Sequence, residues 1–75
     1  MPKKSPANQA LGKAIRAARV HRGYSQEGFA QSKGLDRSHF GAIERGELNI
    51  SIDTLVRITS ALETTAAALC HEAKI

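Results

Sequence analysis

Apolar side chains recur every three or four residues along much of the chain, and this spacing places them on one face of an α-helix. The clearest stripe consists of Ile52, Leu55, Ile58 and Leu62. It predicts a helix over about residues 52–62, and a weaker stripe predicts another over about residues 9–22. No segment alternates apolar and polar residues in the manner of a half-buried strand. The pattern therefore predicts an all-α fold.

Further helix boundaries are predicted from residues that start and stop helices. The residues that can accept a hydrogen bond at a helix N-terminus are Ser25, Asp36, Ser51 and Thr65. Gly34 and Gly46 are placed to end helices. Three shorter helices follow from these residues, one over about residues 26–32, one over about 36–45, and a last one that contains Ala66, Leu69, Cys70 and Ala73. The sequence thus predicts a compact five-helix domain.

The predicted domain covers residues 9–75, and residues 1–8, with two prolines and two lysines, are expected to form a flexible basic arm. A chain of 75 residues buries one modest core and is too short for a roomy catalytic cleft. It contains no serine, histidine and acid set and no glycine-rich phosphate loop. Its three histidines lack the spacing of metal ligands. We therefore expect a protein that is not an enzyme and uses no metal or other cofactor.

Cysteine usage and hydropathy bear on the compartment. Cys70 is the only cysteine, so an intramolecular disulfide is impossible, which suits a reducing environment. No stretch is apolar for long enough to span a bilayer, and no apolar region follows the N-terminal lysines. We expect a cytoplasmic protein.

Positive charge is concentrated in the first third of the chain. The sequence has 11 lysines and arginines against 7 aspartates and glutamates, and residues 1–23 hold six of the basic residues and no acidic one. Such a region can bind a polyanion. A solvated helix face would show the same composition, so charge alone leaves both interpretations open.

The second and third predicted helices are joined by a tight turn of Lys33, Gly34 and Leu35. Glycine can take the left-handed conformation that sets the angle of such a turn, and the small Ala30 lets the two helices approach closely. The face of the third helix away from its apolar residues presents Arg37, Ser38, Gly41, Ala42 and Arg45. A small and polar helix face of this kind fits into the major groove of DNA.

The segment from Ser25 to Ser51 resembles the helix-turn-helix of the XRE/Cro family, which includes phage repressors and restriction-modification controller proteins. The most specific matches are Ser25-Gln26, Ala30, Gly34, Ile43-Glu44-Arg45-Gly46 and Asn49-Ile50-Ser51. The resemblance covers about residues 10–70 and implies a lambda repressor-like domain of five helices. It also implies a transcription regulator that acts as a homodimer on a pseudo-palindromic operator in double-stranded DNA, with no small-molecule effector evident.

The resemblance assigns base reading to the third helix. Arg37 and Ser38 match its first exposed positions, where arginine can pair with guanine O6 and N7 and serine can serve several bases. Ala42 matches a second position, where its methyl group suits a thymine methyl. Gly41 beside it indicates either a close approach of the groove or a tolerated neutral substitution.

Phosphate contacts are implied around this helix. Gln26 matches the family glutamine that holds a phosphate at the start of the second helix, where backbone N–H groups also point at the anion. The other expected phosphate contacts are His39, Arg45, Asn49 and Ser51, together with Lys3 and Lys4 of the arm. The acidic Glu47 does not fit this role.

Two further assignments concern the stability and assembly of the domain. Arg19 and Glu44 match a family ion pair that locks the third helix to the first, the alternative being two independent surface charges. The homodimer is expected to form through the last helix and its approach from the fourth helix, because the last helix is too short to hide both flanks in one domain. The expected interface residues are Ala66, Leu69, Cys70 and Ala73, with Leu69 at the centre.

Several functions remain open within this framework. A controller protein, a phage-type repressor and an antitoxin-like autoregulator share the motif, and the short chain and the run Asn49-Ile50-Ser51 favour the controller. A protein-interaction adaptor that has kept the fold and lost DNA binding is the alternative from another class. Its support is the net charge of zero on the third helix and its flanks, together with Gly41.

Overall fold

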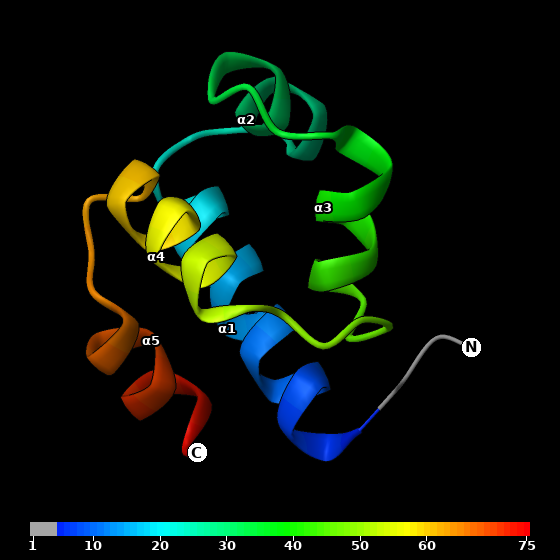
Figure 1. Ribbon diagram of the computed structural model, residues 1–75. Coiled ribbons are helices and arrows are strands. Elements are labelled where there is room, and N and C mark those ends of the chain that lie inside the picture. Colours follow the sequence, from blue (N-terminus) through cyan, green and yellow to red (C-terminus); the bar gives the residue numbers. More distant parts are fainter. Residues whose placement is uncertain (1–4) are drawn as a thin grey trace.

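Residues 5–75, the part of the chain that the structure describes, fold into five helices without a strand, as the computed structural model shows (Figure 1). The helices are α1 (Pro6–His21), α2 (Gln26–Ser32), α3 (Arg37–Glu44), α4 (Ile52–Ala61) and α5 (Ala66–Ala73). The central helix is α1, which contacts α2, α3 and α5. None of these helices is both long and apolar enough to cross a membrane. The predicted all-α, five-helix fold is confirmed.

Side-chain caps explain where the helices begin. Each helix follows a residue whose side-chain oxygen accepts a backbone N–H three residues on, namely Ser5, Ser25, Asp36, Ser51 and Thr65. Such a bond satisfies an N–H group that has no partner within the helix. Because this signal is local, the predicted starts of α2, α3, α4 and α5 agree with the structure within one residue.

The first helix begins earlier than the sequence predicts. The predicted arm covers residues 1–8, but α1 starts at Pro6, and Ser5 caps it by accepting the N–H of Asn8 at 3.0 Å. Proline is favoured at the first position of a helix, where its missing N–H would have no partner in any case. The part of the predicted arm from Ser5 onward therefore belongs to the folded domain.

The core is built around two phenylalanine rings. Phe29 of α2 and Phe40 of α3 are buried with their ring centroids 5.1 Å apart, and the ring of Tyr24 meets Phe29 edge-on at 5.3 Å. Ile15 of α1 and Ile58 of α4 are fully buried in the same core. These contacts join α1 and α4 to the pair α2 and α3, so the core fixes the position of α3.

Two glycines allow α1 to support the end of α3. A Cβ atom on Gly12 would lie 2.5 Å from the carbonyl oxygen of Glu44, and one on Gly46 would lie 2.7 Å from the Cα atom of Gln9. Both distances are too short for non-bonded atoms, so only glycine fits at either position. Gly46 also has a φ of +74°, which favours glycine. The first half of α1 therefore packs directly against the backbone at the end of α3 and just after it.

The structure corrects two assignments on the last two helices. Ile52, part of the predicted core stripe, is 74% exposed, whereas Leu69, the predicted centre of the dimer contact, is 3% exposed and lies in the core. The physical reason lies in the composition of α5, in which Leu69 is the one large aliphatic residue. Because α5 packs against α1 and α4, it uses Leu69 for that contact. Leu69 is therefore not available to a partner.

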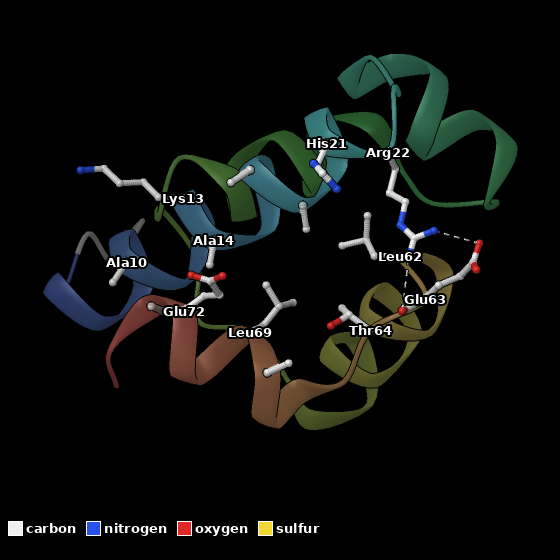
Figure 2. Close-up of a pocket in the computed structure, with 14 residues that line it drawn as sticks. Ala10, Lys13, Ala14, His21, Arg22, Leu62, Glu63, Thr64, Leu69 and Glu72 are labelled. Atoms are coloured by element: carbon white, nitrogen blue, oxygen red, sulfur yellow. Dashed lines mark hydrogen bonds and ion pairs between the residues drawn. The ribbon is translucent and has the colours of Figure 1, made fainter.

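A groove of about 760 Å³ runs between α1 and α5 (Figure 2). Several alanines together with Leu62 and Leu69 form its apolar lining. Its charged residues are Lys13, Arg22, Glu63 and Glu72, and His21 also lines it. Arg22 at the end of α1 reaches Glu63 at 3.5 Å, so this ion pair lies at one end of the groove.

Candidate nucleic-acid interface

The turn between α2 and α3 has the features of a helix-turn-helix. Gly34 has a φ of +69°, a left-handed conformation that glycine adopts without steric strain. The N–H of Leu35 donates to the carbonyl of Ala30 at 2.8 Å, and Ala30 is completely buried. A small buried residue and a left-handed glycine are what this turn needs to bring two short helices together. The predicted helix-turn-helix is confirmed.

The outer face of α3 is open to solvent. Arg37, Ser38 and His39 are exposed in its first turn, and Ala42 is half-buried one turn later. Phe40 faces the opposite way, into the core. The side chains that the sequence assigns to base reading at positions 37, 38 and 42 are thus accessible to a molecule that approaches α3.

Gly41 does not belong to this open face, contrary to the sequence prediction. It is buried, and a Cβ atom on it would lie 3.1 Å from Oε1 of Gln26 and 3.0 Å from Nη1 of Arg45. The space above Gly41 is therefore taken by side chains of the protein itself. Its absent side chain makes room for Gln26 and Arg45, and it is not a surface for bases.

The predicted ion pair between Arg19 and Glu44 is present and buried. Nε and Nη2 of Arg19 donate to the two carboxylate oxygens of Glu44 at 2.8 and 3.1 Å, and the side chains are 8% and 2% exposed. Nη1 of Arg19 also donates to the carbonyl of Tyr24 at 2.7 Å. A two-pronged pair holds both planar groups in one orientation. Because it joins α1 to the last turn of α3, the pair holds α3 in place.

Gln26 belongs to the same network. Its Nε2 donates to Oε1 of Glu44 at 2.9 Å, which links the start of α2 to the end of α3. An amide nitrogen carries two hydrogens, so one of them remains for another acceptor. Over residues 5–75, no buried side-chain nitrogen or oxygen lacks a partner. Because its amide is bonded to Glu44, the side chain of Gln26, which is assigned to phosphate binding, is oriented by the protein before any phosphate is bound.

The two arginines of the exposed α3 region each have a glutamate partner. Nη1 of Arg37 lies 2.9 Å from Oε1 of Glu27, and Nε of Arg45 lies 3.1 Å from Oε2 of Glu47. Helical spacing does not reveal the role of Glu27, because Glu27 and Arg37 belong to different helices and only the turn brings them together. The pairs explain how a face with two arginines carries little net charge.

Side chains in the loop after α3 are also tied to their neighbours. Nδ2 of Asn8 donates to Oδ1 of Asn49 at 2.7 Å, which leaves the amide nitrogen of Asn49 for an external acceptor. Oγ of Ser51 caps α4, and its hydroxyl donates to Oγ1 of Thr54 at 2.9 Å. A phosphate contact by the Ser51 hydroxyl would require this bond to break. Of the two predicted contacts, Asn49 has the freer donor.

The basic residues of the first third are only partly described. Lys3 and Lys4 lie outside the described residues. Arg16 of α1 is exposed, and it falls between Gly12 and Arg19 in the helical register, on the face of α1 that contacts α3. In the sequence, Arg16 is one of the six basic residues of the first third and has no role of its own. Arg16 is placed on this face because Gly12 and Arg19, its neighbours in the helical register, both contact α3.

The chemistry available within residues 5–75 is that of hydrogen-bond donors and charged side chains, without a metal centre. No three or more histidine, cysteine, aspartate or glutamate side chains gather within residues 5–75 in a way that could hold a metal ion. Cys70 is a free, half-buried thiol. The candidate interface is therefore the exposed face of α3 with the residues at the start of α2 and in the following loop.

Comparisons with known proteins agree with this geometry. A model of the helix-turn-helix family matches residues 15–69. The control protein C.SmaI of Serratia marcescens is 36% identical over 59 residues, which cover 79% of this chain and 70% of that protein. The Neisseria hypothetical transcription factor of Neisseria meningitidis serogroup B is 33% identical over 66 residues, or 88% of this chain. The match spans 62% of the length of that relative.

A solved structure has the same fold. The restriction-modification controller protein C.AhdI from Aeromonas hydrophila matches with a TM-score of 0.75 and 36% identity, over 81% of this chain and 92% of that chain. The names of these relatives describe a control protein, a transcription factor and a controller, none of which is an enzyme. With a family model matching most of its length, this chain belongs to the XRE-type helix-turn-helix family of DNA-binding transcription regulators.

Proposed function

We propose that this protein is a sequence-specific transcription regulator of the restriction-modification controller type, acting in the cytoplasm as a homodimer on a pseudo-palindromic operator. The observation that carries the proposal is the exposed face of α3, where Arg37 stands on a helix that the buried pair of Arg19 and Glu44 locks to α1. The similarity to C.SmaI and C.AhdI supports the controller type. No small-molecule effector forms part of the proposal.

In this proposal α3 enters the major groove. Arg37 pairs with O6 and N7 of a guanine, and Ser38 contacts a neighbouring base. The half-buried methyl group of Ala42 can meet a thymine methyl where the groove approaches closely. The buried contacts of α3 with α1 hold these side chains in one geometry, so the protein side of the interface needs little rearrangement.

Phosphate contacts position α3 and carry no sequence information. We assign them to Gln26, through its second amide hydrogen and the N–H groups at the start of α2, and to His39 and Asn49. Arg45 and Ser51 can join them only after giving up the bonds to Glu47 and Thr54 described above. The exposed Arg16 adds a cation on the α1 face next to α3.

A selection of bound sites from random duplex DNA tests the function as a whole. We expect the purified protein to enrich two half-sites related by two-fold symmetry, with centres about 10 base pairs apart. Enrichment of a single half-site would contradict the homodimer. Retention of random DNA without enrichment would contradict sequence-specific binding.

Arg37→Ala should weaken binding to the selected operator by about 1–3 kcal/mol and relax the preference at one base pair in each half-site. Removing the guanidinium takes away a two-pronged contact with one base and leaves the other positions intact. The measurement is a base-preference profile for the variant. Arg22→Ala is the matched control, because Arg22 is also an exposed arginine paired with a glutamate but lies by the groove between α1 and α5. An unchanged profile in Arg37→Ala would remove Arg37 from the base-reading set.

The double variant Lys3→Ala, Lys4→Ala tests the proposed basic arm and keeps the Ser5 cap of α1 intact. We expect weaker binding to operator and random DNA alike, because contacts to phosphates are independent of sequence. The dependence of log affinity on log salt should flatten by about one to two units. An identical salt dependence in the variant and the wild type would show that the arm does not contact DNA.

The alternative function is a protein-interaction adaptor that has kept the fold and lost DNA binding. The observation in its favour is that Arg37 and Arg45 are both paired with glutamates, which lowers the attraction of the α3 face for a polyanion. A mobility-shift assay with random duplex DNA at low salt separates the two functions. The adaptor predicts no shift, whereas the regulator predicts one that disappears as salt is raised.

A further inference from the structure

Glu27 is an acidic residue on a surface proposed to meet a polyanion. It follows Gln26 in the first turn of α2, its side chain is 73% exposed, and its Oε1 accepts a hydrogen bond from Nη1 of Arg37 at 2.9 Å. A carboxylate at this place repels phosphates whatever the base sequence. It therefore lowers the affinity for DNA in general, while it contacts the leading base-reading side chain.

The geometry of the pair leaves the base-reading edge of Arg37 free. The guanidinium contacts Glu27 through Nη1 only, and within residues 5–75 its Nε and Nη2 donate to no other group. The edge formed by Nε and Nη2 presents two parallel N–H donors. Two such donors match O6 and N7 of guanine. Arg37 can thus keep its bond to Glu27 while it pairs with a base.

We propose that Glu27 is a positioning residue that sets the sequence specificity of this chain, by holding Arg37 toward the bases and away from the phosphate backbone. The inference rests on the proposed DNA-binding function. A free arginine can pair with a phosphate at any sequence, and such a contact gives no discrimination. Pairing with guanine through Nε and Nη2 is compatible with the bond from Nη1 to Glu27, and in this inference Arg37 has to give up that bond to swing toward the phosphate backbone. Glu27 therefore weakens binding to random DNA more than binding to the operator.

The size of the effect follows from the exposure of the pair. Exposed ion pairs shift an equilibrium by about two- to five-fold. Such a shift is too small to decide whether the domain folds, and it is large enough to change the preference of Arg37 between a base and a phosphate. The buried pair of Arg19 and Glu44 holds the helix α3 in place, whereas the exposed pair of Glu27 and Arg37 acts only on the orientation of the Arg37 side chain.

The test compares Glu27→Gln with the wild type on three duplexes, namely the selected operator, the operator with the guanine opposite Arg37 replaced, and random DNA. We expect binding to random DNA to tighten about two- to five-fold and discrimination at the Arg37 base pair to fall by a similar factor. For random DNA, the slope of log affinity against log salt concentration should become steeper by about 0.9, because Arg37 gains a phosphate contact.

Two variants separate positioning from bulk charge. Glu47→Gln removes the same charge beside Arg45 and should tighten binding to all three duplexes alike. In an Arg37→Ala background, Glu27→Gln should leave discrimination at that base pair unchanged, because the two residues act through one contact. Two results would overturn the inference, namely unchanged discrimination at the Arg37 base pair in Glu27→Gln, or an equal loss of that discrimination in Glu47→Gln. The proposed function would still stand in either case if the wild type selects an operator. A wild type without any preferred sequence would overturn both.

Discussion

Glu44→Ala should lower the free energy of unfolding by about 3–5 kcal/mol, which is a large fraction of the stability of a domain of this size. The variant leaves the guanidinium of Arg19 almost completely buried without its counter-charge, and it removes the acceptor of the Gln26 amide. Restoring water to Arg19 would require α1 and α3 to separate, because their backbones touch at Gly12. Urea and thermal unfolding followed by far-ultraviolet circular dichroism measure the loss.

Glu27→Ala is the matched control for this prediction. It also removes a glutamate from an arginine pair, with a distance of 2.9 Å against 2.8 Å, but this pair is exposed and has one hydrogen bond, whereas the pair of Arg19 and Glu44 is buried and has two. We expect a change of at most about 1 kcal/mol, since water solvates both partners of an exposed pair. Similar losses in the two variants would show that burial of the pair of Arg19 and Glu44 does not hold α3 to α1.

Val56→Asp should give a folded monomer that binds the operator about 100-fold more weakly or worse. Val56 and Ile52 are large apolar side chains one turn apart on α4, 49% and 74% exposed, and α4 packs against α5. Ala66, Cys70 and Ala73 lie half-buried on α5. We propose these residues as the dimer surface, in place of Leu69. A monomer engages one half-site and loses the gain of binding two sites at once.

Two variants test this placement of the dimer surface. Val20→Asp makes the same change at an exposed valine of α1 and should leave a dimer, which controls for the added negative charge. Leu69→Asp should unfold the domain, because it buries a charge in the core. Sedimentation reports the oligomeric state, and far-ultraviolet circular dichroism reports folding. A dimeric Val56→Asp would place the interface elsewhere.

Local chemistry along the sequence determined the helices and the turn. A cap such as Ser25 satisfies N–H groups within its own helix, so its effect does not depend on the rest of the fold. Gly34 indicated the turn in the same way, because glycine adopts the left-handed conformation of this turn without the steric cost that other residues have. The exposure of Arg37 also followed from the sequence, since a short helix with Phe40 in the core presents residue 37 to solvent.

Which faces of the helices are covered was decided by tertiary structure alone. Periodicity places Gly41 on the polar side of α3, but the side chain of Gln26 from another helix covers it. The apolar stripe of α4 includes Ile52, but the core ends before that residue, whereas Leu69 is the one large aliphatic residue that α5 has for its contact with α1 and α4. The contact between Glu27 and Arg37 depends on how α2 and α3 pack together. Such contacts join residues far apart in the chain, so the packing of the helices decides them and helical spacing does not.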